Sequence, residues 1–342
     1  MKDFRKSWIE FQRIFIGAHF LLSEDIRFDC IWVTFSNFDK WVSFHDMHGR
    51  FFSKEDEKSI TITYEKCSPI KVQIDNKYHV NIVVNLEGHI PTPQLWEGYI
   101  KEKRCIELQS RIEKSFDEYL KLNGIIQNLL NFIIPNEVLI ESIEGIAEAS
   151  KSDLHTPNHS IKQQHIRIFY KSPISNMIKP NTKSQPLLFF EELKDSNQLE
   201  NYMDKWFEIS ERFKPVFDLY FGVMYNPKMY TEFQFLGLAQ ALESYHRIAK
   251  AQKRKWFFKR AKEVYEYYSE VAAVYFKFND KERFATKVKD ARNYFSHWSE
   301  NLGNKVVQEK DLRLLTKDLQ LLLQLCLMTE FGFDIDRIKK IF

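Results

Sequence analysis

The chain has 342 residues, of which 44% are hydrophobic and 28% charged, a balance typical of a folded protein. Its 50 lysines and arginines against 47 acidic residues leave a net charge of +3, which identifies no class of partner. The content of only 10 glycines and 10 prolines excludes a fibrous or low-complexity protein. At about 150 residues per domain, the length predicts two domains.

The four cysteines, Cys30, Cys67, Cys105 and Cys326, lie far apart and form no CxxC pair. This spacing excludes the usual structural zinc patterns and argues against a disulfide framework. The first residues are charged and lead into no apolar segment, and no stretch reaches about 18 apolar residues. We therefore expect a reduced, soluble, cytoplasmic protein without a signal peptide or a membrane partner.

Short β-branched or aromatic runs dominate the first hundred residues. Separated by turn residues, they predict strands over 31–35, 40–44, 60–64, 78–84 and 105–108. A helix is expected over 115–132, because apolar residues there recur on one helical face. Residues 138–146 are ambiguous, whereas 166–170 form a convincing strand that is able to pair with them.

A proline-containing linker follows, and beyond it the pattern becomes helical. Residues 171–186 hold Pro173, Pro180 and Pro186 among Ser, Asn and Thr. Helices are then predicted over 197–213, 215–224, 229–250, 257–276, 280–298 and 308–329. The fold class expected is α+β: a β-rich N-terminal domain over 1–185, followed by an all-α helical bundle over 186–342.

One segment of the helical half carries groups suited to RNA cleavage: Arg292-Asn293-Tyr294-Phe295-Ser296-His297. A guanidinium can bind a phosphate bidentately, and an imidazole can move protons near neutral pH. Asn293 and His297 are four residues apart and share a helix face. Arg292 and His297 are separated by about 140° on an ideal helix, so their convergence requires a helix end or a second subunit.

The spacing alone is weak, because chance supplies about one such Arg–His pair in a chain of this composition. Arg13 and His19 also match, but they flank the apolar segment Ile14–Gly17, and we interpret that pair as structural. For Arg292 and His297 considered alone, a helix-capping histidine and a surface arginine are an equally good interpretation.

A resemblance to a known family favours one of these interpretations. Residues 292–297 resemble the HEPN superfamily, whose ribonuclease members carry Arg, a polar residue and, a few residues later, His on a late helix. Upstream, the run Ala-Leu-Glu-Ser-Tyr-His-Arg at 241–247 is similar to a helix of ApeA-like HEPN proteins. The front half, with Gly17-Ala18-His19-Phe20 and Trp41, resembles the N-terminal domain that accompanies HEPN in ApeA anti-phage proteins.

This resemblance implies a metal-independent ribonuclease that needs no cofactor and acts as a homodimer with a composite cleft. His297 would transfer protons, Arg292 would bind the scissile phosphate, and Asn293 would orient the site. Glu243, on the earlier helix, would hold Arg292 in place, although an ordinary surface acid is the alternative interpretation. The RNA 2′-OH would attack the adjacent phosphate and leave a 2′,3′-cyclic phosphate.

A basic run lies between the two motifs. No acid occurs between Glu243 and Glu263, whereas eight lysines and arginines accumulate there around Trp256-Phe257-Phe258. Cations with interleaved aromatics can hold phosphates and stack bases. The RNA-binding residues predicted on this basis are Lys253, Arg254, Lys255, Lys259 and Arg260. The alternative is a solvated helix connection with core aromatics.

Metal sites and other enzyme classes have no support. The histidine clusters, His45 with His48 and His155 with His159 and His165, lie in loop-like sequence without a cysteine partner, which favours solvated histidines over zinc ligands. Motifs of P-loop, Rossmann, α/β-hydrolase, kinase and zincin enzymes are missing.

The sequence therefore predicts a HEPN endoribonuclease of prokaryotic anti-phage defence that cleaves cellular or phage RNA, with tRNA as the expected target. The front domain is interpreted as a sensor or regulator, and a phage protein as its candidate trigger. Two alternatives stay open: a HEPN domain that binds RNA or a protein without cleaving, and a purely structural helical domain.

Overall fold

The computed structural model describes residues 11–42, 68–74, 78–89, 99–147, 165–172, 174, 185–193, 196–251, 254–297 and 309–342. Its contacts divide the chain into two compact units. The sheet unit comprises Met1–Leu130, Val138–Pro173 and Leu188–Glu200, and the helical unit comprises Asn131–Glu137, Ile174–Leu187 and Asn201–Phe342. The units interleave along the sequence. The boundary near residue 185, as a border between independently folding domains, stays a prediction.

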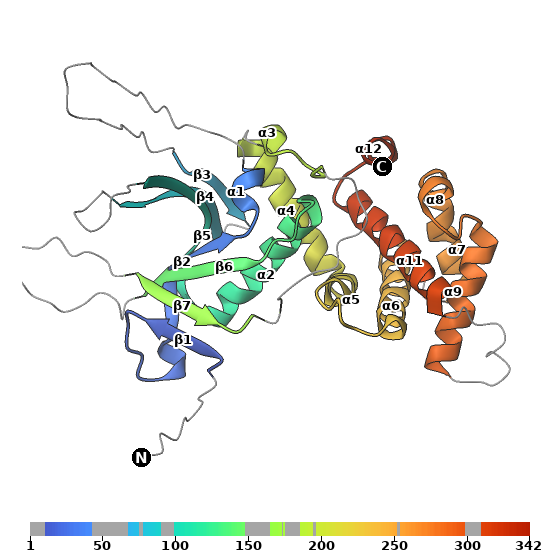
Figure 1. Ribbon diagram of the computed structural model, residues 1–342, viewed down its shortest axis with the longest axis horizontal. Coiled ribbons are helices and arrows are strands. Elements are labelled where there is room, and N and C mark those ends of the chain that lie inside the picture. The colour runs from blue at the N-terminus through green and yellow to red at the C-terminus, as the bar shows by residue number, and fades with distance from the viewer. Residues whose placement is uncertain are drawn as a thin grey trace, which may run out of the picture. The chain divides into compact units, whose positions relative to one another are not determined.

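The described part of the sheet unit contains one antiparallel sheet with the strand order β1-β7-β6-β2-β5-β4-β3 (Figure 1). Its strands are β1 Arg13–Ile16, β2 Arg27–Phe35, β3 Ile70–Ile74, β4 Tyr78–His89, β5 Tyr99–Ser115, β6 Ile140–Ile146 and β7 Ile166–Tyr170. The long β5 pairs with β2 on one side and with β4 on the other. This architecture confirms the predicted β-rich front half.

Apolar residues of the central strand β2 form part of the core of the sheet unit. Phe28, Ile31 and Val33 are fully buried along it. On the neighbouring β6, Gly145 lies opposite Ile31. A Cβ at Gly145 would lie 2.6 Å from the ring of Phe28, so only glycine lets that ring pack against the strand.

Helical segments complete the sheet unit: the 3-10 turn η1 Ser23–Asp25 and the helices α1 Phe38–Trp41, α2 Phe116–Ile133 and α3 Phe190–Leu193. The first part of α2 packs on β2 (Figure 1), where the Tyr119 hydroxyl donates to the carbonyl of Asp29 at 2.8 Å. The helix predicted over 115–132 is thus confirmed, and the last residues of α2 belong to the helical unit.

The strand predicted over 40–44 is wrong where the structure describes it. Asn37 adopts a left-handed conformation with φ 60° and turns the chain out of β2 into the helical turn α1. Trp41 on this turn is buried, and its indole N–H donates to the carbonyl of Leu188 at 2.8 Å. Trp41 and Val42 are apolar because they enter the core, and an apolar run this short does not distinguish a strand from a short helix.

Most of the other strand predictions are confirmed, one lies outside the described residues, and two strands were missed. Strands over 31–35, 78–84 and 105–108 are confirmed within longer elements, and the strand over 166–170 is confirmed as β7. The segment 138–146 contains β6, which pairs with β7 as anticipated. The segment 60–64 lies outside the described residues. The prediction missed β1 and β3, the two outer strands of the sheet. β1 has only four residues and is mostly exposed, whereas β3 alternates apolar and polar residues, a signal that the sequence reasoning overlooked.

The helical unit contains the tail of α2 and a series of further helices. These are α4 Ser196–Arg212, α5 Lys214–Met224, α6 Thr231–Lys250, α7 Phe257–Tyr267, α8 Ser269–Tyr275, α9 Lys281–Ser296, α11 Glu309–Glu330 and α12 Ile335–Ile341. The first residues of α4 belong to the sheet unit. No helix within the described ranges combines the length and apolarity needed to span a bilayer.

Helix α6 is the centre of this bundle, because it packs against α5, α7, α9 and α11. The helical predictions are confirmed within a few residues, except that 257–276 is two helices rather than one. The break is at Tyr268, whose backbone leaves the helical region and whose buried hydroxyl hydrogen-bonds to the Thr329 hydroxyl at 2.8 Å. The tyrosine ring therefore packs toward α11 at the expense of helix continuity.

A buried polar network joins α6 to α7. His246 is fully buried; its Nε2 lies 2.8 Å from the Glu263 carboxylate and its Nδ1 3.4 Å from an Arg260 nitrogen. Because arginine can only donate, Nδ1 accepts and Nε2–H donates to Glu263. Glu263 also pairs with Lys255. Burial lowers the pKa of His246 below its ordinary value of 6.5, against the raising effect of Glu263.

A cluster of packed aromatic rings forms part of the core of the helical unit. Trp206 on α4 is fully buried, and its ring centroid lies 5.1 Å from that of Phe132, 5.1 Å from that of Phe217 and 5.2 Å from that of Phe331. Aromatic pairs at these separations contribute beyond the area that they bury. Phe132 comes from the end of α2, so this cluster draws on a segment far away in the sequence.

Replacing Trp206 tests the importance of this cluster. Trp206→Ala should lower the free energy of unfolding by about 3–5 kcal/mol, because it removes a fully buried indole and leaves a cavity. Urea denaturation followed by circular dichroism measures this difference. Trp256→Ala is the matched control, because that indole is 82% exposed and its removal should change stability little. Equal effects of the two variants would contradict the assignment of the core.

The lowered pKa of His246 predicts a pH dependence of stability. Below pH 6.5, His246 takes up a proton in the unfolded chain but not in the folded protein, where it is buried. The free energy of unfolding should therefore decrease as the pH is lowered from 6.5 to the pKa that His246 has in the folded protein. Urea denaturation across this window should show a shallower acid slope for His246→Gln than for the wild type. The half-exposed His165 supplies the control variant His165→Gln. An unchanged slope in His246→Gln would exclude His246 as the source.

Candidate active site

The end of α9 presents the Arg-Asn-x-x-x-His segment. Asp280 caps the start of this helix by accepting from the backbone N–H of Arg283 at 2.7 Å. The helix ends at Ser296, and His297 follows with φ −139° and ψ 60°, its N–H donating to the carbonyl of Asn293 at 2.8 Å. His297 therefore lies at a helix end, one of the two conditions that its spacing from Arg292 requires.

Glu243 on α6 binds Arg292 on α9. The Glu243 Oε2 accepts from Arg292 Nη2 at 3.2 Å, and its Oε1 accepts from Arg247 Nη2 at 2.6 Å. Glu243 is only 7% exposed, so it is not the ordinary surface acid of the alternative interpretation. The carboxylate thus fixes the arginine of the motif, as the family resemblance implies.

Arg292 is held on a second side by an aromatic ring. Its guanidinium carbon lies 5.4 Å from the ring centroid of Phe257, the first residue of α7. The side chain stays 29% exposed. A guanidinium that is fixed by a carboxylate and a ring, and still reaches solvent, is suited to bind an external phosphate.

The two other predicted site residues of the segment differ in their exposure. His297 is exposed and Asn293 partly exposed. Within the described residues, the structure records no hydrogen bond from either side chain to another protein group. His297 is thus accessible to solvent and Asn293 partly so, and their catalytic roles stay predictions.

The residues of the basic run differ in exposure and in ion pairing more than the sequence indicates. Arg254 and Lys259 are exposed, and together with Lys255 and Trp256 they line a shallow hollow at the start of α7. Lys255 is 21% exposed and paired with Glu263. Lys253 lies outside the described residues.

The prediction that Arg260 binds RNA is wrong, because Arg260 is fully buried. Its Nε donates to the carbonyl of Lys255 at 2.8 Å, and another of its nitrogens approaches His246. Arg260 lies on the inner side of the first turn of α7, where it holds the preceding loop rather than an external phosphate. A run of basic residues does not show which of them points inward.

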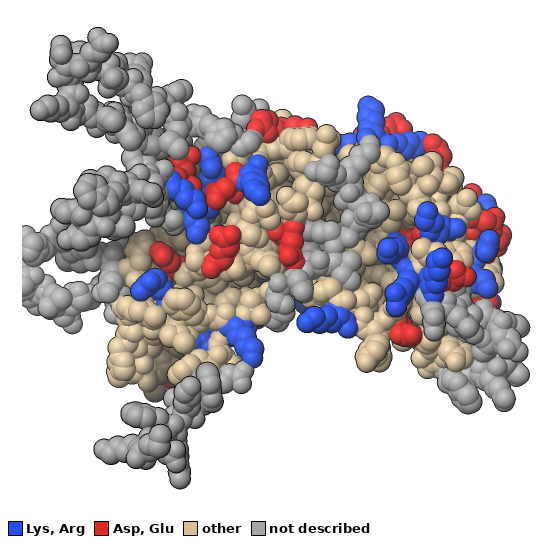
Figure 2. All heavy atoms as spheres, in the orientation of Figure 1, with Lys and Arg blue, Asp and Glu red and all other residues tan. Residues whose placement is uncertain are grey.

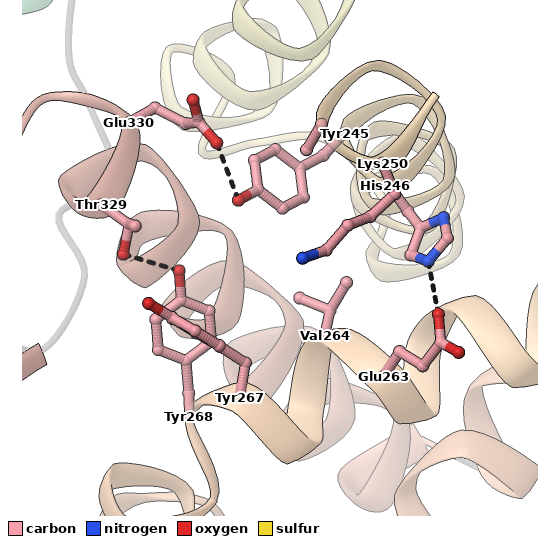
Figure 3. Close-up of a pocket in the computed structure, with 10 residues that line it drawn as sticks. Tyr245, His246, Lys250, Glu263, Val264, Tyr267, Tyr268, Thr329 and Glu330 are labelled. Carbon is pink, nitrogen blue, oxygen red and sulfur yellow. Dashed lines mark hydrogen bonds and ion pairs between the residues drawn. The ribbon is translucent and has the colours of Figure 1, made fainter. Parts of the chain in front are cut away.

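A cavity of about 380 Å³ between α6, α7 and α11 was missed by sequence reasoning (Figure 3). Its walls include Tyr245, whose hydroxyl donates to Glu330 at 3.2 Å, and Tyr268, which is bonded to Thr329. The side chain of Lys250 extends into it between Tyr245 and Val264 (Figure 3). Most polar groups of this cavity are therefore already satisfied, and in the sequence they have the spacing of ordinary core residues.

The histidines considered as metal ligands give no site in the described part of the chain. His165 stacks on Trp32 with ring centroids 4.8 Å apart and lies 3.2 Å from Glu144. His45, His48, His155 and His159 lie outside the described residues. Across the described ranges, no three His, Cys, Asp or Glu side chains are grouped as metal ligands.

Two family models match the chain. The model of the Apea-like HEPN matches residues 236–337, which include Glu243 and Arg292, and the model of ApeA N-terminal domain 1 matches residues 5–206, which include the sheet. No curated protein and no solved structure matches it. The N-terminal match alone covers more than half of the 342 residues, and the helical match covers the bundle around α6. The chain belongs to the ApeA-like HEPN proteins.

Proposed function

We propose that this protein is a metal-independent HEPN endoribonuclease of anti-phage defence. The observation that supports this most directly is the ion pair between buried Glu243 and Arg292, five residues before an exposed histidine at a helix end. The carboxylate fixes a phosphate-binding group, and the neighbouring imidazole is open to a substrate. Acid–base cleavage of a phosphodiester needs these two kinds of group.

In the proposed reaction, Arg292 binds the non-bridging oxygens of the scissile phosphate and stabilises the charge that develops on them. His297 transfers the protons, and Asn293 orients the substrate by hydrogen bonding. The 2′-oxygen loses its proton and bonds to phosphorus, while the bond from phosphorus to the 5′-oxygen breaks and that oxygen gains a proton. The products are a 2′,3′-cyclic phosphate and a 5′-hydroxyl end. The arrangement needs no metal or cofactor, as the resemblance to HEPN ribonucleases implies.

A homodimer is part of this proposal. One chain offers a single Arg292–His297 pair, whereas the cleavage requires one group to accept a proton and another to donate one. Two copies facing each other across a composite cleft would supply both. The exposure of His297 and the partial exposure of Asn293 support such an arrangement.

The substrate proposed is cellular or phage RNA, with tRNA as the expected target. Lysines and arginines gather over the helices of the helical unit, with acidic residues among them (Figure 2). Of the predicted RNA-binding residues, Arg254 and Lys259 are exposed cations near Phe257, on which Arg292 packs. We assign RNA guiding to these two and to Lys253 and Lys255. The sheet unit is proposed as the sensor or regulator, with a phage protein as trigger.

An RNA cleavage assay in EDTA tests the proposed chemistry. The wild type should cut total tRNA or a long transcript and leave cyclic-phosphate 3′ ends. His297→Ala should lower the rate by about 10²–10⁴-fold, as for loss of a general acid–base group, and Arg292→Ala by about 10²–10³-fold. Arg283→Ala on the same helix and His165→Ala in the sheet unit are matched controls that should keep full activity.

Cleavage that survives in His297→Ala, or that EDTA abolishes, would contradict the mechanism. If the wild type binds RNA without cutting it, both purified and when expressed in phage-infected cells, the HEPN domain that binds without cleaving becomes the better description. Expression during infection is needed because a defence nuclease is restrained until it is triggered.

The dimer makes a separate prediction. Multi-angle light scattering at working concentration should give twice the chain mass of 41.1 kDa. Mixing inactive His297→Ala chains with inactive Arg292→Ala chains should then restore part of the activity if a composite cleft takes groups from both copies. A monomeric mass in the presence and absence of RNA would contradict the composite cleft.

A further inference from the structure

We propose that Trp256 is a stacking platform for an unpaired base of the RNA, adjacent to the phosphate held by Arg292. The inference rests on the proposed function and deepens it, because it names the substrate class as RNA with an unpaired nucleotide at the cleavage position.

Trp256 is more exposed than the other tryptophans that the structure describes. It is 82% exposed, whereas Trp206 is fully buried and Trp41 is 8% exposed. A large exposed indole next to buried Phe257 is not explained by the packing of α7. Exposed aromatics of this size are typical of surfaces that bind another molecule.

The surroundings of Trp256 indicate a nucleic acid rather than an apolar protein surface. Arg254 and Lys259 are exposed beside it, and within the described residues the structure records no ion pair for either. Glu263, the nearby acid, is already shared by Lys255 and His246. An indole flanked by uncompensated positive charge can hold a base by stacking while the cations bind the neighbouring phosphates.

The platform lies directly beside the candidate active site. The next residue in the chain, Phe257, carries the guanidinium of Arg292 over its ring at 5.4 Å. Consecutive Cα atoms are about 3.8 Å apart, so Trp256 lies within the reach of a nucleotide whose phosphate is bound by Arg292. One strand of RNA can therefore engage both residues.

Buried contacts fix the platform in position. Arg260 holds the carbonyl of Lys255 at 2.8 Å through its Nε, and the backbone N–H of Arg260 donates to the carbonyl of Trp256 at 3.2 Å. The Lys255–Glu263 pair adds a second attachment of the same loop to α7. An indole on an anchored backbone loses little freedom when it stacks, which favours binding. The burial of Arg260 thus has a role in the RNA surface, although Arg260 does not touch the RNA.

Stacking on Trp256 requires a base with an open face. Bases inside a duplex are covered on both faces by their neighbours, and sequence readout of RNA by proteins is directed mostly at loops, bulges and ends. The platform therefore selects single-stranded or looped RNA over duplex RNA at the cleavage position.

Binding of RNA to the full chain tests this inference without any need for cleavage. Every protein carries His297→Ala to prevent cutting, and the probes are a fluorescent single-stranded RNA and the same strand in a blunt duplex. Trp256→Ala should weaken single-strand binding by about 5–100-fold, the range that one lost base stack gives, and leave duplex binding unchanged. Trp256→Phe should retain part of the affinity. Tyr230→Ala, which removes another aromatic that is 76% exposed, is the matched control.

A second probe locates the contact. Abasic replacements placed one at a time along the single strand should reveal a position at which wild-type Trp256 and Trp256→Ala bind equally. Equal affinity of Trp256→Ala and the parent for the intact single strand would overturn the proposal, and so would equal losses on single strand and duplex. A fall in oligomeric mass on Trp256→Ala, with RNA binding unchanged, would assign the indole to a protein contact instead.

The outcomes separate this inference from the proposed function. Trp256-dependent binding of single strands by a wild type that never cuts RNA would remove the nuclease and keep the platform. Cleavage that depends on His297 and does not change in Trp256→Ala would keep the nuclease and remove the platform.

Discussion

The carboxylate of Glu243 lies between two helices of the bundle, and the position of Arg292 depends on it. A carboxylate this deeply buried is costly unless it is paired, and here it accepts from Arg247 on its own helix and from Arg292 on α9. The packing of α6 against α9 therefore sets the direction of the guanidinium. Phe257 on α7 supports its other side, so three helices fix the position of one guanidinium.

Sequence reasoning identified the helices of this arrangement but could not orient their side chains. The apolar periodicity of α6 and α9 was sufficient to place them, because their buried faces are continuous. The Glu243–Arg292 contact joins residues 49 positions apart, and only the family resemblance indicated it. The inward direction of Arg260 and the outward direction of Trp256 were not predictable, because both follow from how α7 begins rather than from composition.

Ion pairs with acids at the ends of the basic run and on another helix also change how this run is interpreted. Its eight cations have no acidic neighbour within the run, because acids are missing between Glu243 and Glu263. In three dimensions those two flanking acids neutralise Arg247 and Lys255, while Lys262 pairs with Glu282 on α9. Of the described cations of the run, Arg254 and Lys259 stay exposed beside Trp256. Local sequence charge overestimates a binding surface wherever acids from other elements fold back onto it.

The interleaving of the two units has a consequence for how the family can be dissected. The chain passes from one unit to the other five times, and residues 131–137 from the front half of the sequence belong to the helical unit. A fragment that begins at residue 186 would lack Phe132 and expose one face of Trp206. The helical unit is therefore not separable at the linker: gene fusions or truncations that divide the chain there would remove part of its hydrophobic core.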